Sequence, residues 1–521
     1  MRSKIVSLSL IVLVISFVFI VTWTPGLSGK PGASTASSPK TKTLHFAVPY
    51  SFDFNYDPVE RNYINLQFLF RAIYSTLFKL DSHLRAYPFL LENYERKGKI
   101  VIFQIKKDAW FSDGSPITSE EVIRSIEAGM RHSSSPNPVY KVIEGGEEFF
   151  QGKTQHCTGI KARGPKVVEI RLKDENVAFA YYFTASIMAI LPLHRNENRK
   201  PENMSFSGTF RVVNFQRHEK EAVVTLEQNP YYVSKKSKID TLVVHFYHEH
   251  SDFEKAIRKG EPDLFLYNRH FKLPGSKYKY NYFKTPSFGA FYFKLNASKG
   301  PFRDKHLRTF FKDFILSWDL AGSEKWELAA PSRMVLPYSL TGYFVFNPMV
   351  PGNFKKLAPK ERIKITCVNS REGIRKTLLP LLKKKLSRYN LDLDLEWESL
   401  DKIKEREKKR DFDLTSNYYV VDVPLSSYFY EILFTPGHEL NLFGYEVPEA
   451  LELLAAYRKE TDELKKLKIL SRLEAIAQEE AFLIPLLNPH SLLGYKGYVK
   501  NVKIDKFLNV NFEDIDVKKG H

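Results

Sequence analysis

The stretch VIFQIKKDAWFSDGSPITSEEV, residues Val101–Val122, contains the signals of a strand, a turn and a helix start in immediate succession. The apolar segment Ile100–Ile105 predicts a short strand, and the pair Asp113-Gly114 is typical of a turn. Thr118 opens a T-x-x-E capping box, in which two side chains satisfy free N–H groups of the first helical turn. A helix is therefore predicted over Ser119–Met130.

Strand and helix patterns alternate along the rest of the chain. Further strands are predicted at Leu44–Pro49, Val167–Leu172, Ala222–Glu227, Thr241–Tyr247 and Arg362–Val368. Further helices are predicted at Asp252–Lys259, Leu307–Ser317, Ile374–Arg388 and Asp462–Ala481. In the last of these, Leu and Ile recur at three-residue spacing on one face. With no internal repeat, this alternation indicates a mixed α/β fold with several sheets.

Composition bounds the class of protein but not its partner. The 521 residues correspond to about three compact units or two large lobes. An apolar fraction of 43% excludes global disorder, and 2 cysteines exclude a disulfide scaffold or a Cys-rich metal module. The 78 Lys and Arg exceed the 60 Asp and Glu by 18, so nucleic acid, a membrane surface or an acidic ligand are all compatible with the charge.

The N-terminus predicts export. Arg2 and Lys4 precede the uninterrupted apolar run Ile5–Val21, which is the layout of a secretory signal. The run also approaches the ~20 residues that cross a bilayer, so residues 1–23 are either a cleaved signal peptide, which we favour, or a membrane anchor. Residues 24–42, rich in Pro, Gly, Ser, Thr and Lys, are expected to form a flexible linker. The remaining chain is expected to work outside the cytoplasm.

Sequence motifs of catalysis are absent, since the chain contains no H-E-x-x-H, G-x-S-x-G or G-x-G-x-x-G pattern. His245, His248 and His250 form the densest histidine cluster. Three imidazoles can bind a transition metal, but no cysteine lies nearby, and a polar strand end that runs into a loop is the favoured interpretation. The sequence therefore predicts a protein that is not an enzyme and that holds no metal or cofactor.

A series of segments resembles, in order, the extracellular solute-binding proteins of peptide ABC transporters, the family 5 proteins with dipeptide-, oligopeptide- and nickel-binding members. The stretch quoted first is similar to the family's strand, Asp-Gly turn and helix. Other similar segments are Ala72–Leu77, Ser207–Phe210, Glu227–Tyr232, Lys259–Leu264, Pro301–Asp304, Asp411–Leu414 and Ile484–Leu486. Together they cover residues 43 to 515. Because the order is kept, the series is more specific than any one motif.

The resemblance implies an α/β, two-lobed periplasmic binding protein-like fold of the large class II type, with mixed sheets, flanking helices and a hinge. The implied parts are a first lobe of 43–285 plus 490–515, an extra subdomain within it at about 72–195, and a second lobe of 286–489. The chain would cross between lobes near 285–288 and 485–489. Cys157 and Cys367 would then lie in different lobes, and since these must move apart, both thiols are expected to stay unpaired.

The resemblance also implies how a ligand is held. A peptide has free backbone N–H and C=O groups, so one strand from each lobe can bond it through the main chain. The family pattern places these strands near Pro49–Phe54 and Asn417–Asp422. A buried terminal ammonium requires a carboxylate, and Asp422 matches the first acid of the family's motif. The motif's later acid and Pro are missing here, and Pro424 comes early, so Asp422 as a loop cap is the alternative.

Aromatic side chains flank both expected strands. Phe52, Tyr418 and Tyr419 are therefore predicted as ligand contacts, since aromatic walls commonly line ligand clefts. Most of the 40 Phe residues are expected to build cores instead.

The implied function is the substrate-binding component of an ABC importer, which binds a peptide between its lobes and delivers it to a membrane permease. The expected location is the periplasm, with an uncleaved N-terminal segment as a tether if residues 1–23 are retained. A monomer that does not bind nucleic acid is expected. The alternative function is a membrane-anchored regulatory protein that uses the same domain to sense a ligand.

Overall fold

The structure is a computed structural model, and it describes residues 41–50, 52, 55–60, 66–131, 137–174, 178–192, 200, 203–267, 275–318, 329–338, 340, 357–370, 374–507 and 509–518. Residues Thr41–His521 belong to one compact unit. The predicted signal or anchor at 1–23 and most of the predicted linker at 24–42 lie outside the described residues.

The largest sheet contains twelve strands within the described ranges. Along its path these are β16 (Leu391–Trp397), β15 (Ile363–Asn369), β17 (Leu414–Val420), β13 (Gly289–Leu295), β18 (Leu483–Lys496), β11 (Leu264–Tyr267), β1 (Thr43–Val48), β10 (Thr241–Tyr247), β9 (Glu221–Gln228) and β8 (Phe210–Arg217). Two more, β12 (Tyr280–Pro286) and β14 (Ala329–Pro331), pair with β18 outside this path.

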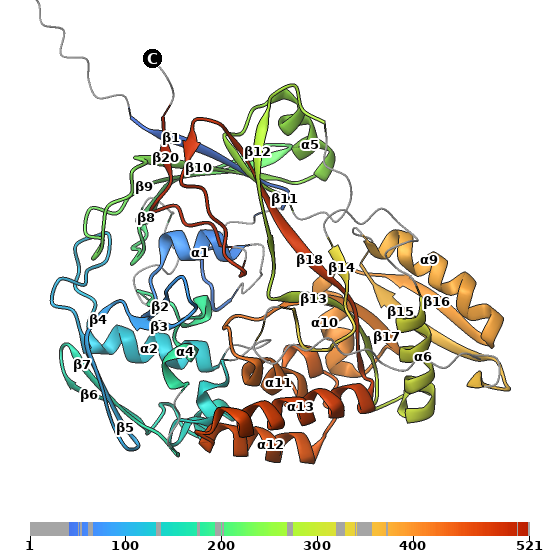
Figure 1. Ribbon diagram of the computed structural model, residues 1–521. Helices are drawn as coiled ribbons and strands as arrows, with labels where there is room; N and C mark the ends of the chain where they lie inside the picture. The colour runs from blue at the N-terminus through green and yellow to red at the C-terminus, as the bar shows by residue number, and fades with distance from the viewer. Residues whose placement is uncertain are drawn as a thin grey trace, which may run out of the picture. The chain divides into compact units, whose positions relative to one another are not determined.

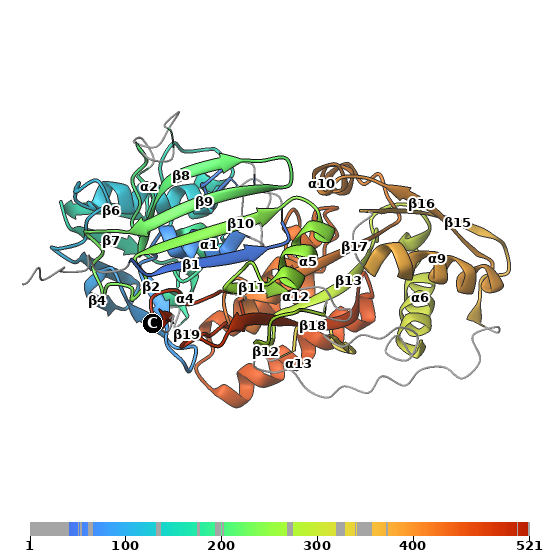
Figure 2. The ribbon, with the colours of Figure 1, turned by 90° about the horizontal axis from the view of Figure 1, so that it is seen from above.

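The long strand β18 lies in the middle of this sheet and joins its two halves, as Figures 1 and 2 show. Its first part pairs with β13, where Lys294 faces Leu483, and its last part pairs with β11 and β12, where Thr285 faces Ser491. The change of partner falls between Pro286 and Gly289, close to the crossovers expected at 285–288 and 485–489. The bounds of the two lobes themselves stay a prediction.

The stretch Val101–Val122 folds as its local signals predict. β5 (Ile100–Ile105) lies in a four-stranded sheet, in the order β4 (Leu91–Lys97), β5, β7 (Val167–Arg171) and β6 (Ile160–Gly164). Both bonds of the capping box are present at the start of α2 (Ser119–Met130). Gly114 in the turn has φ of 81°, a left-handed conformation that favours glycine. Both the strand and the helix are confirmed.

Helices cover the sheets. They include α1 (Gln67–Ile73), α5 (His250–Lys259), α6 (Lys305–Ser317), α9 (Ile374–Leu386), α10 (Leu400–Lys409), α11 (Ser426–Phe434), α12 (Pro448–Lys459) and α13 (Glu463–Glu480). The predicted long helix is confirmed in α13, where Asp462 caps the N-terminus by accepting a hydrogen bond from the N–H of Lys465. No helix in the described ranges has the length and hydropathy needed to span a membrane.

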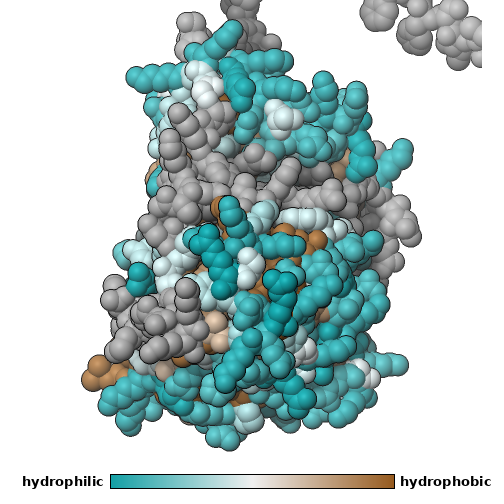
Figure 3. Space-filling model, turned by 90° about the vertical axis from the view of Figure 1, so that its right-hand side faces the viewer, coloured by the Kyte–Doolittle hydropathy of each residue, from teal (hydrophilic) through white to brown (hydrophobic). Residues whose placement is uncertain are grey.

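Apolar side chains gather in three buried clusters. One of them packs α6 and α9 against β13, β15 and β16, and it encloses Cys367. Cys157 lies in the largest cluster. Both thiols are free, as predicted, and burial raises the pKa of each, that of Cys157 to about 11 and that of Cys367 to about 12. The outer face in Figure 3 is predominantly hydrophilic.

Candidate functional site

A pocket of about 130 Å³ lies along β17. Three of the four predicted ligand contacts line it: Tyr418, Tyr419 and Asp422. The other lining residues are Gln67 of α1, Lys294 of β13, Ser416, Asn417 and Val420 of β17, Leu400, Ile403, Lys404 and Glu407 of α10, and Glu439 and Leu442. Gln67 belongs to the expected first lobe and the others to the expected second lobe, so the pocket joins parts of the chain that are remote in sequence.

One backbone edge of β17 lies at this pocket, and along most of its length no described strand pairs with it. On one side the strand pairs with β13 along its whole length, from Leu414 to Val420. On the other side it pairs with β15 at Leu414 alone, as far as the described residues show. The next groups on that side, the N–H and hydroxyl of Ser416, donate to Asn369 Oδ1. Beyond Ser416 the strand therefore presents main chain to the pocket on the side away from β13.

Close packing against β13 fixes the position of β17. Gly289 faces Val420, and a Cβ at this glycine would lie 2.5 Å from Val420 Cγ2 and 2.8 Å from the carbonyl oxygen of Tyr419. Both distances are shorter than real side chains tolerate, so only glycine allows the strands to approach here. The end of β17, at Tyr419 and Val420, is thus held close to β13 by backbone packing.

The two tyrosines of β17 differ in how their hydroxyl groups are satisfied. Tyr418 stacks on Phe291 with ring centroids 4.8 Å apart, and its hydroxyl lies 3.2 Å from Ser287 Oγ. The hydroxyl of Tyr419 is buried and has no hydrogen-bond partner in the part of the chain that the structure describes. Burial raises the pKa of both side chains, so both are neutral donors at neutral pH. A buried hydroxyl without a partner is costly unless a ligand group bonds it.

Asp422 lies two residues after the end of β17, in the turn before α11, and is half-buried. Its negative charge acts on Arg71 of α1. Burial lowers the pKa of Arg71, and the charges of Asp505 and Asp422 offset only part of this effect. The same charge helps to raise the pKa of Tyr419 and Tyr428, after the larger effect of burial. Asp422 therefore interacts electrostatically with Arg71, Tyr419 and Tyr428.

A buried ion pair lies at the other side of the pocket. Lys294 Nζ and Glu407 are 2.6 Å apart, and their side chains are only 3% and 2% exposed. Thr415 Oγ1 donates to Glu407 Oε1 at 2.7 Å, so the carboxylate accepts hydrogen bonds from both Thr415 and Lys294. Sequence reasoning missed this pair. The signal was a single Lys within GAFYFKL, the otherwise apolar strand β13, because buried lysine is rare without a partner.

Phe52 lies in the hydrophobic core. It is 1% exposed, it stacks on Phe246 at 4.8 Å, and it contacts the rings of Tyr56 and Phe215. It does not line the pocket beside β17, and the strand β1 ends at Val48, before the expected ligand-binding strand at Pro49–Phe54. Of that segment, Ser51, Asp53 and Phe54 lie outside the described residues. The packing of Phe52 explains its burial without a ligand.

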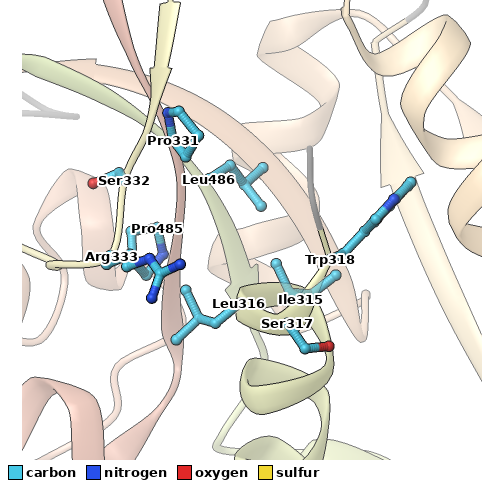
Figure 4. Close-up of a pocket in the computed structure, with 9 residues that line it drawn as sticks. All are labelled: Ile315, Leu316, Ser317, Trp318, Pro331, Ser332, Arg333, Pro485 and Leu486. Carbon is cyan, nitrogen blue, oxygen red and sulfur yellow. The ribbon is translucent and has the colours of Figure 1, made fainter. Parts of the chain in front are cut away.

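A second pocket, of about 180 Å³, lies where the end of α6 approaches β14 and β18 (Figure 4). Its lining is Ile315, Leu316, Ser317, Trp318, Pro331, Ser332, Arg333, Pro485 and Leu486. Among the described residues of this lining, the charged side chain is the cation Arg333. The chemistry does not suit an ammonium group, so the pocket beside β17 is the stronger candidate for a peptide terminus.

The histidine cluster does not form a three-ligand centre. His245 lies on β10, His250 is the first residue of α5, and His248 lies between these elements. In the described ranges no group of three or more His, Cys, Asp or Glu residues is arranged to hold a metal ion.

Comparison with known proteins supports the resemblance seen in the sequence. Residues 85–309 match the sequence model of the bacterial extracellular solute-binding proteins, family 5 (middle part). The periplasmic oligopeptide-binding protein OppA of Escherichia coli K12 is 24% identical over 249 residues, which is 45% of this chain and 45% of OppA. The probable D,D-dipeptide-binding periplasmic protein DdpA of the same organism is 22% identical over 438 residues, 78% of this chain and 81% of DdpA.

Among solved structures, Haemophilus influenzae OppA in complex with the peptide RPPGFSPFR is similar, with a TM-score of 0.76 and 18% identity over 92% of this chain and all of that chain (100%). The resemblance to family 5 and the predicted fold, mixed α/β and like that of two-lobed periplasmic binding proteins, are confirmed. The chain matches less than half the length of E. coli OppA, 45%, at the level of sequence. The matched proteins are named as binding proteins, not as enzymes.

Proposed function

We propose that this chain, a relative of the family 5 extracellular solute-binding proteins, is the substrate-binding component of an ABC importer and engulfs a peptide beside β17. The observation that carries the proposal is a pocket that contains Asp422, two residues beyond the end of β17, and the edge of β17 that pairs with β15 at Leu414 alone among the described residues. The binding protein would then deliver its cargo to a permease in the membrane. It would act in the periplasm, as a monomer and without a catalytic step.

The chemistry of the pocket suits the N-terminal end of a peptide. The edge of β17 beyond Ser416 offers main-chain hydrogen bonds, so a peptide adds as a further strand whatever its side chains are. The ammonium group is then placed at Asp422, where a carboxylate compensates for its loss of water. The hydroxyl of Tyr419 supplies an additional donor that the protein itself does not use within its described part.

The pocket is too small to admit a peptide as it stands, so binding requires the two lobes to open and then close around the ligand. Its volume, about 130 Å³, is below the ~300–1,000 Å³ typical of ligand sites, so a peptide enters only when the two sides move apart. Gln67 and β17 are on opposite sides in the expected division into lobes. A ligand that bonds both sides stabilises the closed form over the open one, and this shift in population is the signal that a permease reads.

The function is tested by identifying the ligand and then removing its charge partner. Native mass spectrometry of protein purified without refolding is expected to reveal co-purified peptides. In calorimetric titrations Asp422→Asn should weaken binding of such a peptide by about 100-fold, which corresponds to the ~3 kcal/mol lost when a buried ammonium has no carboxylate. N-acetylation of the peptide should have the same effect on the wild-type protein.

The matched control is Asp392→Asn on β16, an acidic residue outside the pocket lining, which should leave the affinity unchanged. If acetylated and free peptides bind equally well, Asp422 does not hold the ammonium. If a sugar or a metal chelate co-purifies in place of a peptide, the peptide assignment is wrong.

A sensory function is the second candidate, and the apolar run Ile5–Val21 favours it. A retained anchor would hold the binding domain at the membrane, where closure reports a ligand to a membrane partner. N-terminal sequencing of the exported protein separates the two functions. A mature chain that begins after residue 23 supports the importer component, and one that keeps the run supports the anchored sensor.

A further inference from the structure

Two histidines and a glutamate form a row across three neighbouring strands. β1 and β10 run parallel with Ala47 facing His245, and β10 pairs with β9, which begins at Glu221. His45 Nδ1 lies 3.1 Å from His245 Nε2, and His245 Nδ1 lies 2.9 Å from Glu221 Oε2. The row lies on the sheet away from the β17 pocket and shares no residue with its lining.

The glutamate fixes which nitrogen of His245 carries the proton. A carboxylate only accepts hydrogen bonds, so His245 Nδ1 carries the hydrogen and donates it to Glu221. In the neutral imidazole, Nε2 of His245 then has its lone pair directed at His45.

The separation of the two nitrogens matches the bite of a metal ion. Zn–N bonds are about 2.0–2.1 Å, so two nitrogens on one ion are about 2.9 Å apart at a right angle and about 3.4 Å apart at a tetrahedral angle. The 3.1 Å between His45 Nδ1 and His245 Nε2 falls inside this range. An ion bound to both nitrogens lies to one side of the line that joins them and takes the place of the hydrogen bond between the rings, and the neutral His45 then carries its single proton on Nε2.

The surroundings of the pair resemble those that proteins build behind a metal ligand. Metal-bound histidines commonly donate their second N–H to a carboxylate, which orients the ring and increases its basicity. Glu221 occupies this position behind His245. The main-chain N–H of His45 donates to Asp263 Oδ2 at 3.0 Å, so its strand is also anchored. The side chains of His245 and Glu221 are 22% and 26% exposed, which gives an ion access from solvent.

We propose that His45 and His245 bind one divalent first-row transition ion, with Zn²⁺ as the probe, and that Glu221 is the positioning carboxylate behind His245. Imidazole nitrogen is a preferred ligand of such ions, and water completes the coordination. The ion ties β1 to β10. This site goes beyond the proposed peptide-binding function and does not depend on it.

The test uses the full exported chain without an affinity tag, stripped with a chelator and titrated with ZnCl₂ by calorimetry at pH 7.5. One ion per chain is expected. His245→Ala and His45→Ala should each weaken binding at least 10-fold, and Glu221→Gln should weaken it about 10-fold, the lower end of the loss seen when such supporting carboxylates change. His248→Ala is the matched control, because this residue bonds the carbonyl of His218 instead.

A second measurement keeps the proposal falsifiable if an alanine variant folds poorly. Cu²⁺ bound to the wild-type protein should show an electron paramagnetic resonance spectrum with two imidazole nitrogens, and His245→Gln should leave one or none. Binding that is unchanged in His45→Ala and His245→Ala, or lost equally in His248→Ala, would overturn the assignment. So would a wild-type protein that takes up no Zn²⁺.

Discussion

Strand β17 and the segment that follows β1 both carry aromatic side chains, but they use them differently. On β17, Tyr419 lines a pocket and its hydroxyl has no partner in the described part of the chain. After β1, Phe52 is enclosed by the rings of Phe246, Tyr56 and Phe215. An aromatic ring that packs against other rings contributes to stability, whereas a tyrosine hydroxyl beside a pocket is available to a ligand. Affinity and stability should therefore respond to different substitutions.

The largest expected effect is on stability, at Phe52. Phe52→Ala removes a fully buried ring and should lower the free energy of unfolding by about 4 kcal/mol. The affinity of the folded protein for its ligand should not change, since the side chain lies outside the pocket lining. Urea denaturation and calorimetric titration measure the two quantities. Phe283→Ala, at an exposed position of β12, is the matched control, and it should cost less than about 0.5 kcal/mol.

A loss of affinity without a loss of stability would contradict this interpretation of Phe52. If Phe52→Ala weakens ligand binding strongly while the unfolding transition stays in place, the segment after β1 contacts the ligand as the sequence predicted. The two regions would then share one function.

The second expected effect is at the ion pair beside the pocket. Lys294→Met leaves the carboxylate of Glu407 buried without a cation and should cost about 3 kcal/mol of unfolding free energy. The double variant Lys294→Met/Glu407→Leu removes both charges and should recover most of this loss. Thermal and urea unfolding of the single and double variants measure it. A double variant as unstable as the single one would show that hydrophobic repacking, not charge burial, is responsible.

Local features were predictable from the sequence, and long-range contacts were not. The strand Ile100–Ile105 and the helix Ser119–Met130 rest on signals within a few residues, namely periodicity and the capping box. The pair Lys294–Glu407 joins positions 113 residues apart, and no local sequence pattern predicts which residue pairs with Lys294. Its only trace was a lysine in an apolar strand.

The residues of the candidate site were likewise predictable only as far as local sequence determines their surroundings. Tyr418, Tyr419 and Asp422 were predicted because their segment resembles a family pattern, and the structure places all three beside one pocket. Phe52 was predicted on equal grounds, but the enclosing rings of Phe246 and Phe215 come from β10 and β8, which are far along the chain. Whether an aromatic residue faces core or cleft depends on such neighbours. The row His45–His245–Glu221 was missed because it also forms only across strands.

The third expected effect is a dependence of stability on pH, and it comes from His438. This residue precedes Glu439 of the pocket but is buried like Phe52, with Nε2 3.1 Å from the hydroxyl of Tyr140. Burial, with a smaller effect from the charge of Lys141, lowers its pKa from 6.5 to about 3. Between these values the unfolded chain binds a proton that the folded chain excludes, so stability is lost as the pH falls below 6.5.

The loss should be about 2 kcal/mol between pH 7 and pH 5 in the wild-type protein, beyond that of His438→Gln. Urea unfolding of both proteins across this range measures the difference. His156→Gln, at an exposed histidine, is the matched control and should keep the wild-type slope. Parallel pH profiles for the wild type and His438→Gln would mean that His438 is open to protons in the folded state.

The smallest expected effects are on the two tyrosines of β17, and they should have opposite signs. Tyr419→Phe removes a buried hydroxyl without a described partner, so the unliganded protein should be unchanged or up to about 1 kcal/mol more stable, while ligand binding weakens about 3- to 10-fold. Tyr418→Phe breaks the contact with Ser287 Oγ and should cost about 1 kcal/mol of stability instead. Urea unfolding without ligand and calorimetric titration with it measure both variants. Equal affinity of Tyr419→Phe and the wild type would show that the ligand leaves this hydroxyl unused, and the edge of β17 and Asp422 would then have to hold the ligand alone.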